Sequence, residues 1–176
     1  ITYWASGLQV MSLGATPVFA DINEDTLCID PDDIEKRITP RTKAIMPVHF
    51  TGEMPDMPEL VKIAKKHNLP IVEDACQAIL AECDGKRAGT WGVAGGFSLH
   101  PLKNLNVWGD GGITVTNDDD VAARHQRRGR REPEPRDLVV ARRVLLDVEV
   151  GLRDVRLRLV VVVVGDEVLD RVRGEE

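Results

Sequence analysis

PIVEDACQ, residues 70–77, is the stretch from which the fold can be inferred. Residues 70–73 are short and largely apolar, as in a buried strand, and Asp74 follows them directly. A helix is predicted just before them, because Asp56 can cap it and Glu59 stands three residues later as a capping partner. Such an alternation of helix and strand is typical of an α/β domain with a mostly parallel sheet.

The same alternation extends in both directions from this stretch. The elements predicted upstream are a helix over 3–13, a strand over 16–20, a helix capped by Asp30 with Pro31 in its first turn, and a strand over 43–49. The elements predicted downstream are strands over 96–99 and 112–116, followed by a helix capped by Asn117 or Asp118.

Two residues whose side chains could take part in catalysis or binding follow predicted strands. Open α/β sheets bind ligands beyond the carboxyl ends of their strands, where Asp74 and Lys103 are expected to lie. A buried acid needs a partner, and a pyridinium nitrogen is one: enzymes that use pyridoxal phosphate (PLP) pair it with an Asp and bind the cofactor through a lysine Schiff base. Taken singly, Asp74 is more simply a helix N-cap and Lys103 an exposed loop lysine.

The neighbourhood of Lys103 adds two weaker signals. Ser98 lies five residues earlier, and its hydroxyl can donate to a phosphate oxygen or, as an ordinary buried serine, bond to backbone. The glycine-rich residues 109–112 permit either a close backbone approach or a plain turn before a strand.

Three segments occur in order: GATPVFADINEDTLCIDPDDIEKRITPRTKAIMPVHFTGEMPDM, IVEDACQAILAECDGKRAGTWGVAGGFSLHPLKNL and GDGGITVTND. Together they resemble the DegT/StrS sugar aminotransferases, PLP enzymes of the aspartate-aminotransferase fold (fold type I). The resemblance covers about residues 1–120. It implies that this region is part of the large PLP-binding domain, with a mostly parallel sheet flanked by helices.

The resemblance also implies roles for single residues. Lys103 would bind PLP covalently and move the proton during transfer, and Asp74 would keep the pyridine nitrogen protonated. Gln77 would lie beside the ring, and Ser98 would bind the phosphate.

Three further residues have less certain roles. Tyr3 occupies the position of an aromatic residue that stacks on the ring in relatives, although the neighbouring Trp4 is an alternative register. His49 and His100 are candidates to line the site, and a structural role is at least as good an explanation for both.

A lysine at position 103 favours transamination over the sugar 3-dehydratase branch of the family, which has histidine there. The implied reaction moves an amino group, from glutamate, to a keto group of a nucleotide-linked sugar in amino-sugar or polysaccharide biosynthesis. The alternatives are a non-catalytic regulatory or binding relative and the dehydratase branch. Relatives are homodimers of roughly twice this length, so we expect a compromised dimer and a weak or inactive chain.

Bulk composition excludes several other classes. The net charge of −6 gives no reason to expect binding to nucleic acid or an anionic membrane, and no apolar run approaches the ~20 residues of a membrane helix. The three cysteines form no C-x-x-C pair, so we expect neither a disulfide framework nor a metal site, and a cytoplasmic location fits best.

The composition changes near residue 121. Residues 121–176 contain 13 Arg but no Lys, Ser, Thr, Asn, Ile, Met, Cys, Phe, Tyr or Trp. Our hypothesis is that this Arg/Val-rich tail is a frameshifted or misjoined translation that was not selected for the fold. A divergent terminal region is the alternative.

Overall fold

Four strands form the central sheet of the computed structural model, which describes residues 1–109, 111–128 and 160–162. Their order is β1 (Val72–Asp74), β4 (Ala94–Ser98), β5 (Gly112–Val115) and β6 (Val160–Val162). β1 and β4 run parallel, whereas β5 pairs antiparallel with both β4 and β6. Residues 129–159 and 163–176, most of the Arg/Val-rich tail, lie outside the described residues.

The predicted strand over 43–49 lies beside β1 and exchanges four backbone hydrogen bonds with residues 70–74. Two isolated parallel bridges join them, Ile45 to Ile71 and Val48 to Asp74. These bridges extend the parallel part of the sheet by one extended segment.

The helices begin where the sequence predicts. They are α1 (Trp4–Ser12), α2 (Pro31–Arg37), α3 (Met57–Lys66) and α4 (Asp119–Arg128), with a 3-10 turn, η1 (Phe50–Gly52), before α3. The side chains of Asp30 and Asp56 accept the backbone N–H groups of Asp32 and Glu59 at 3.0 and 2.9 Å, as N-caps do. Asp118, not Asn117, caps α4: its Oδ1 accepts from the backbone N–H groups of Asp120 and Val121.

One predicted strand is wrong. Residues 16–20 form no strand, and the side chains of Val18 and Phe19 are 68% and 64% exposed. A strand needs a neighbour that completes its hydrogen bonds, and no described segment pairs with these residues.

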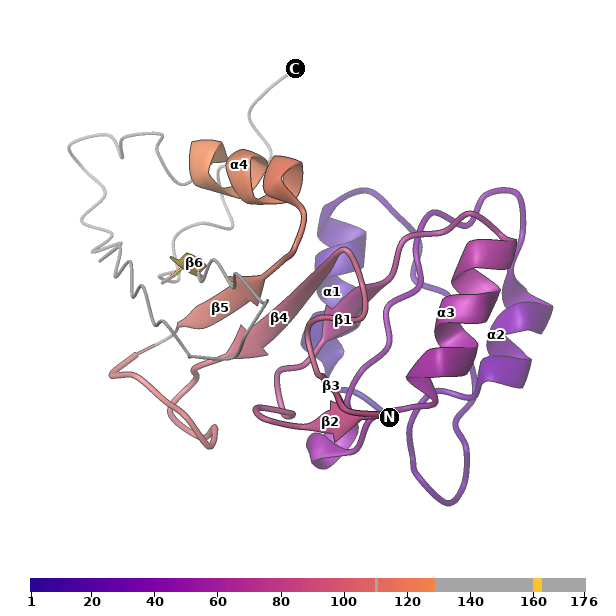
Figure 1. The fold of residues 1–176 in the computed structure, drawn as a ribbon, viewed down its shortest axis with the longest axis horizontal. Coiled ribbons are helices and arrows are strands. Elements are labelled where there is room, and N and C mark those ends of the chain that lie inside the picture. Colours follow the sequence, from indigo (N-terminus) through magenta and orange to yellow (C-terminus); the bar gives the residue numbers. More distant parts are fainter. Residues whose placement is uncertain (110, 129–159, 163–176) are drawn as a thin grey trace.

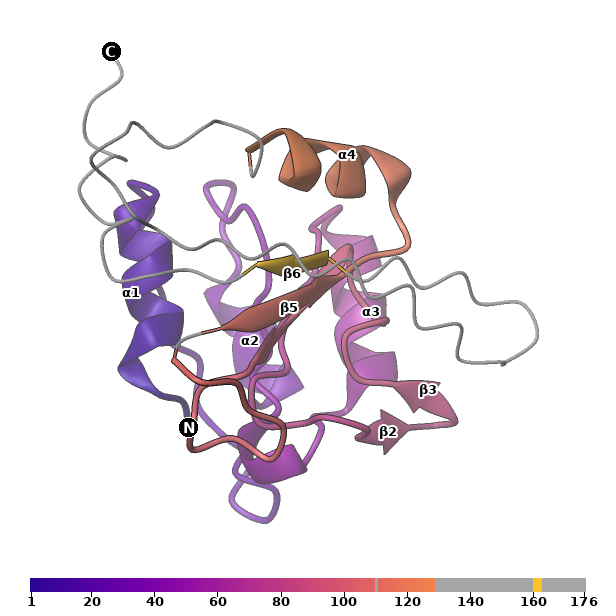
Figure 2. The same cartoon turned by 90° about the vertical axis from the view of Figure 1, so that its left-hand side faces the viewer.

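The hydrophobic core lies between the α2–α3 pair and the β1 side of the sheet. Figure 1 shows α2 and α3 side by side, and Figure 2 shows α1 and α3 on opposite sides of the strands. A short hairpin, β2 (Glu82–Cys83) with β3 (Lys86–Arg87), lies beyond the core. The buried core residues are Ile34, Ile45, Met54, Met57, Leu60, Ile63, Ala64, Ile71, Ala75, Ala78 and Ala88.

A buried carboxylate fixes the chain around β1. Glu73 is 1% exposed, and its two oxygens accept the backbone N–H groups of Gly89, Trp91 and Gly92 at 2.6–2.7 Å. His49, 0% exposed, lies with Nε2 3.0 Å from Glu73 Oε2. Because a carboxylate only accepts, Nε2 carries the donated hydrogen. Glu73 therefore holds the 89–92 loop and the 43–49 segment against the same strand.

Close backbone packing brings this loop onto β4. A Cβ built on Gly95 would stand 2.3 Å from the Gly89 Cα, and one on Gly92 would stand 2.2 Å from the Ile71 carbonyl oxygen. Only glycine permits these approaches. In the described ranges, no helix is long and apolar enough to cross a membrane.

Candidate active site

The carboxyl ends of β1 and β4 meet at one edge of the sheet. The two strands are parallel neighbours, with Asp74 opposite Gly96, so Asp74 and Ser98 each end their strand on the same side. This is the edge at which open α/β sheets bind ligands.

The Asp74 carboxylate is held at both oxygens. Oδ2 accepts the hydroxyl of Ser6 at 2.6 Å, and Oδ1 accepts the backbone N–H of Cys76 at 3.2 Å. Its main chain donates to the Pro47 carbonyl at 2.9 Å and accepts from the His49 N–H at 3.0 Å. Asp74 is thus fixed both by the sheet and by side-chain contacts.

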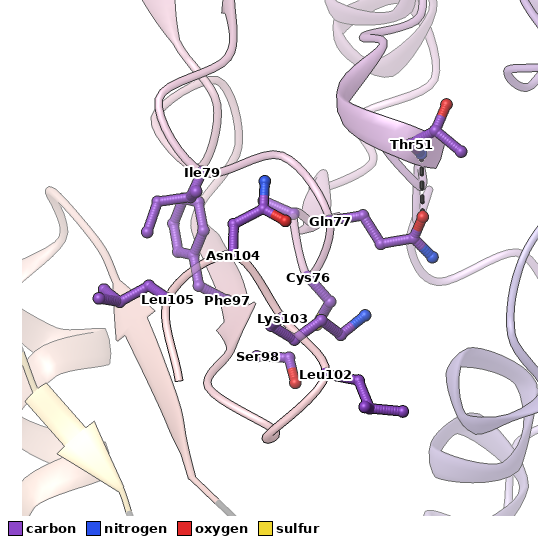
Figure 3. A pocket seen from close by; sticks show the side chains of 11 residues that line it. Thr51, Cys76, Gln77, Ile79, Phe97, Ser98, Leu102, Lys103, Asn104 and Leu105 are labelled. Atoms are coloured by element: carbon purple, nitrogen blue, oxygen red, sulfur yellow. Dashed lines mark hydrogen bonds between the residues drawn. The ribbon is translucent and has the colours of Figure 1, made fainter. Parts of the chain in front are cut away.

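A cavity of about 220 Å³ opens beside this edge. Three predicted residues, Gln77, Ser98 and Lys103, line it (Figure 3). Asp74 does not line it, but the next two residues of the chain do. The complete lining is Thr51, Ala75, Cys76, Gln77, Ile79, Phe97, Ser98, Leu102, Lys103, Asn104 and Leu105.

Gln77 is oriented by the turn before α3. Its Oε1 accepts the backbone N–H of Thr51 at 2.9 Å, drawn as the dashed line in Figure 3. Thr51 has φ 55° and ψ 19°, a left-handed conformation that is uncommon for a β-branched residue.

Lys103 lies in the loop after β4. Its backbone N–H donates to the His100 carbonyl at 2.8 Å, and its own carbonyl accepts from the Asn106 amide at 3.3 Å. Among the described residues, no carboxylate forms an ion pair with its amine, unlike Lys62 and Lys66 on α3. Ser98 Oγ accepts from the His100 N–H at 3.3 Å, so this loop is tied back to the end of β4.

The pKa of the Cys76 thiol is set by burial and by the charges beside the cavity wall. Burial and the negative charge of Asp74 raise the pKa of the Cys76 thiol to about 12. The positive charge of Lys103 opposes this shift. The thiol therefore responds to both of the residues on which the predicted chemistry depends.

The less certain candidates lie away from the cavity lining. Tyr3 immediately precedes α1 and makes no side-chain capping bond. It is 63% exposed and makes an edge contact with Trp4, so its stacking role stays a prediction. His49 is the structural partner of Glu73. His100 is exposed, and its Nδ1 accepts the Leu102 N–H at 3.2 Å.

Sequence reasoning missed Ser6, Thr51 and Cys76. Ser6 stands 68 residues before Asp74, and nothing in its local pattern marks the contact. The part of the chain that the structure describes contains no group of three His, Cys, Asp or Glu side chains that could hold a metal ion.

The sequence model of the DegT/DnrJ/EryC1/StrS aminotransferase family matches residues 1–131. A dTDP-3-amino-3,4,6-trideoxy-α-D-glucose transaminase of Streptomyces venezuelae is 48% identical over 123 residues, which are 70% of this chain and 32% of that protein. A pleiotropic regulatory protein of Geobacillus stearothermophilus is 47% identical over 121 residues, covering 69% and 32%.

The fold has solved counterparts at comparable identity. The structure of S. venezuelae DesV in complex with a ketimine intermediate superposes with a TM-score of 0.71 at 44% identity, covering 77% of this chain and 37% of that one. The chain spans about a third of the length of the curated relatives it matches. The described region thus has the fold of part of a fold type I large domain.

Proposed function

The chain belongs to the DegT/DnrJ/EryC1/StrS aminotransferase family, and from this membership we propose that it is part of a PLP-dependent enzyme that aminates a nucleotide-linked keto sugar. Relatives named as a dTDP-sugar transaminase, a UDP-sugar 3-aminotransferase and a GDP-perosamine synthase support this substrate class. Glutamate is the proposed amino donor.

The observation that carries the proposal is that four candidate residues lie at or just beyond one edge of the sheet. Gln77, Ser98 and Lys103 line one cavity, and Asp74 ends the adjoining strand. These groups fit PLP chemically: a carboxylate for the ring nitrogen, an amine for the aldehyde and a hydroxyl for the phosphate. When bound, PLP would supply an electron-accepting ring.

The protein's own groups would then act as follows. Lys103 Nζ would hold the cofactor and afterwards carry the proton that moves during amino transfer. The Asp74 carboxylate, held at both oxygens, would keep a proton on the ring nitrogen. Gln77, which Thr51 orients, would fix the plane of the cofactor ring. Ser98, at the end of β4, would hold the phosphate of the cofactor.

Because the chain spans about a third of its relatives' length, we propose that this segment alone is a weak or inactive catalyst. The homodimer, which comes from the family resemblance, and the cytoplasmic location, which comes from the cysteine pattern, are likewise proposals. A non-catalytic regulatory role is the second candidate, which the name of the G. stearothermophilus relative favours.

The deciding experiment is covalent trapping. The full chain is mixed with PLP, reduced with borohydride and digested, and the modified peptide is located by mass spectrometry. We expect the adduct on Lys103 and its loss in Lys103→Ala, whereas Lys86→Ala, which removes an exposed lysine from the β3 strand, should leave it unchanged.

Amino transfer from glutamate separates the two candidates. An adduct with no transfer, even in a full-length relative carrying this segment, would favour the regulatory role. No adduct on Lys103 would contradict both the cofactor assignment and the proposed activity.

A further inference from the structure

Two hydroxyl groups of the N-terminal segment lead to the Asp74 carboxylate. Thr2 Oγ1 lies 2.6 Å from Ser6 Oγ, and Ser6 Oγ lies 2.6 Å from Asp74 Oδ2. All three side chains are partly buried. The contacts join α1 to the end of β1 across 68 residues of sequence.

The direction of the hydrogens follows from the chemistry of the acceptor. An ionised carboxylate only accepts, so the single hydrogen of the Ser6 hydroxyl points to Asp74. Ser6 then has no hydrogen left for Thr2, so Thr2 is the donor between the two hydroxyls; at 2.6 Å, Ser6 is a closer acceptor for the Thr2 hydroxyl than the Tyr3 carbonyl at 3.3 Å. The order is therefore Thr2 to Ser6 to Asp74, and each bond polarises the next.

The opposite side of the carboxylate is fixed independently. The backbone N–H of Cys76 donates to Oδ1 at 3.2 Å, while Ser6 donates to Oδ2. Because each oxygen has one donor, the carboxylate cannot rotate about the Cβ–Cγ bond of Asp74 without losing a hydrogen bond. Without Ser6, only the longer of the two bonds would remain.

The backbone of α1 is seated so that Ser6 reaches this position. The next residue, Gly7, is the buried residue of the helix, and a Cβ there would come within 3.0 Å of the Phe19 ring. The Ser6 N–H also bonds to the Tyr3 carbonyl at 3.2 Å. Ser6 is thus placed by packing and by the first turn of the helix.

We propose that Ser6 is a positioning residue for cofactor binding, which sets the orientation of Asp74 toward the ring nitrogen of PLP, with Thr2 holding the Ser6 hydroxyl in its donating direction. This inference rests on the proposed function, because it assigns Asp74 to the ring nitrogen. It adds α1 to the elements that build the site.

The test is a titration of the full chain with PLP, followed by absorbance over a range of pH. Ser6→Ala should weaken PLP binding roughly tenfold, the effect of losing about one charge-assisted hydrogen bond. It should also shift the pH at which the cofactor spectrum changes, because Asp74 acts on the ring proton. Ser6→Thr keeps the hydroxyl and should restore both properties.

Two further variants act as controls. Ser12→Ala removes a hydroxyl from the same helix that donates to the Gln9 carbonyl at 2.8 Å, and should change neither property. Thr2→Val keeps the bond between Ser6 and Asp74 and should shift both properties less, in the same direction. If Ser6→Ala fails to fold, Thr2→Val and Ser6→Thr decide the matter.

Unchanged affinity and pH profile in Ser6→Ala, or in Thr2→Val where that variant decides, would overturn the inference while leaving the proposed function intact. Equal losses in Ser6→Ala and Ser12→Ala would also overturn it, since the helix as a whole would then be responsible. If the unsubstituted chain forms no adduct on Lys103, the proposed function fails and the inference fails with it.

Discussion

At the scale of single residues, the site is built from side chains whose charges act on one another. Cys76 lies two residues after Asp74 in the chain and lines the same cavity as Lys103, and both of these charges act on the pKa of its thiol. Its high pKa makes it a poor nucleophile at neutral pH, because the thiolate is the reactive form.

We predict that Cys76 resists alkylation. The pKa rises from 9.0 to about 12, a difference of 12 − 9.0 = 3, so its thiolate population near neutral pH should be roughly a thousandfold below that of a free cysteine. Iodoacetamide labelling, quantified for each cysteine by mass spectrometry, checks this. The rate should increase with pH up to about 12.

Two substitutions should change the labelling rate of Cys76 in opposite directions. Asp74→Asn removes the charge that raises the Cys76 pKa and should speed labelling, whereas Lys103→Ala should slow it further. Because the folded pKa lies above the unfolded one, Cys76 contributes stability below about pH 9 that is lost as the pH rises toward 12. Rapid labelling of Cys76 at pH 7 in the folded chain would contradict the assignment.

Residue positions, though not yet residue roles, were predictable where strand ends and motifs agree. Gln77, Ser98 and Lys103 line one cavity as expected, because the carboxyl ends of parallel neighbours meet. Ser6 and Thr51 were not predictable, since their contacts join residues 68 and 26 positions apart and depend on how α1 and η1 pack.

At the scale of elements, Glu73 joins β1 to two neighbouring segments through its side chain. The 43–49 segment makes two isolated bridges, and the 89–92 loop is held by three N–H groups on one carboxylate. Hydrophobic periodicity predicted the strand over 70–73, but not this polar anchor.

Glu73→Gln should therefore be severely destabilising. A glutamine amide turns one acceptor into a donor that faces backbone N–H groups, so at least one buried donor loses its partner. We expect the free energy of unfolding to fall by roughly 3 kcal/mol, measured by urea denaturation. Glu82→Gln, which breaks only an exposed pair with Arg87, should cost no more than about 1 kcal/mol.

Gly95 offers a second test of this packing. Gly95→Ala should push the 89–92 loop off β4, because its Cβ would overlap the Gly89 backbone. The neighbouring Gly96→Ala should be tolerated, since its Cβ would meet nothing closer than 4.0 Å. Thermal melts of both variants check the contrast, and equal melting temperatures would refute it.

Strand prediction failed where pairing, not composition, decides. Residues 16–20 have strand-like composition, yet no described segment supplies hydrogen bonds to them. Cap residues were predicted better, because Asp30 and Asp56 act within three residues of their own helix starts.

At the scale of the whole molecule, the described region exposes large apolar side chains. Trp4, Met11 and Leu13 on and beside α1 are 64%, 60% and 76% exposed, and Phe19 lies nearby. Large apolar side chains exposed together on one element often mark a contact with another protein surface.

We therefore expect the isolated chain to self-associate. Sedimentation velocity over a range of concentrations should show larger species, and Trp4→Glu should reduce them. Gln9→Glu adds the same charge to the same helix at an exposed polar position and should have little effect. A monomer at every concentration would contradict the expectation.

The Arg/Val-rich tail leads to a genetic prediction. If residues 121–176 arise from a frameshift, the DNA read in another frame beyond codon 120 should encode continued family-like sequence. The family match extends to residue 131 and α4 to Arg128, so the boundary at 120 itself stays a prediction. A single clean frame through this point in related genes would refute the hypothesis.

Glu73 and Asp74, the adjacent acidic residues of β1, should be constrained by different requirements: Glu73 by folding and Asp74 by activity. A library screened only for folded protein, with no cofactor present, should reject most replacements at Glu73, because its carboxylate ties together three segments of chain. In the same folding screen, more replacements should be tolerated at Asp74. They should be eliminated only in a second selection in which growth depends on the reaction. Substitutions at two neighbouring codons would thus separate the requirement for folding from the requirement for activity.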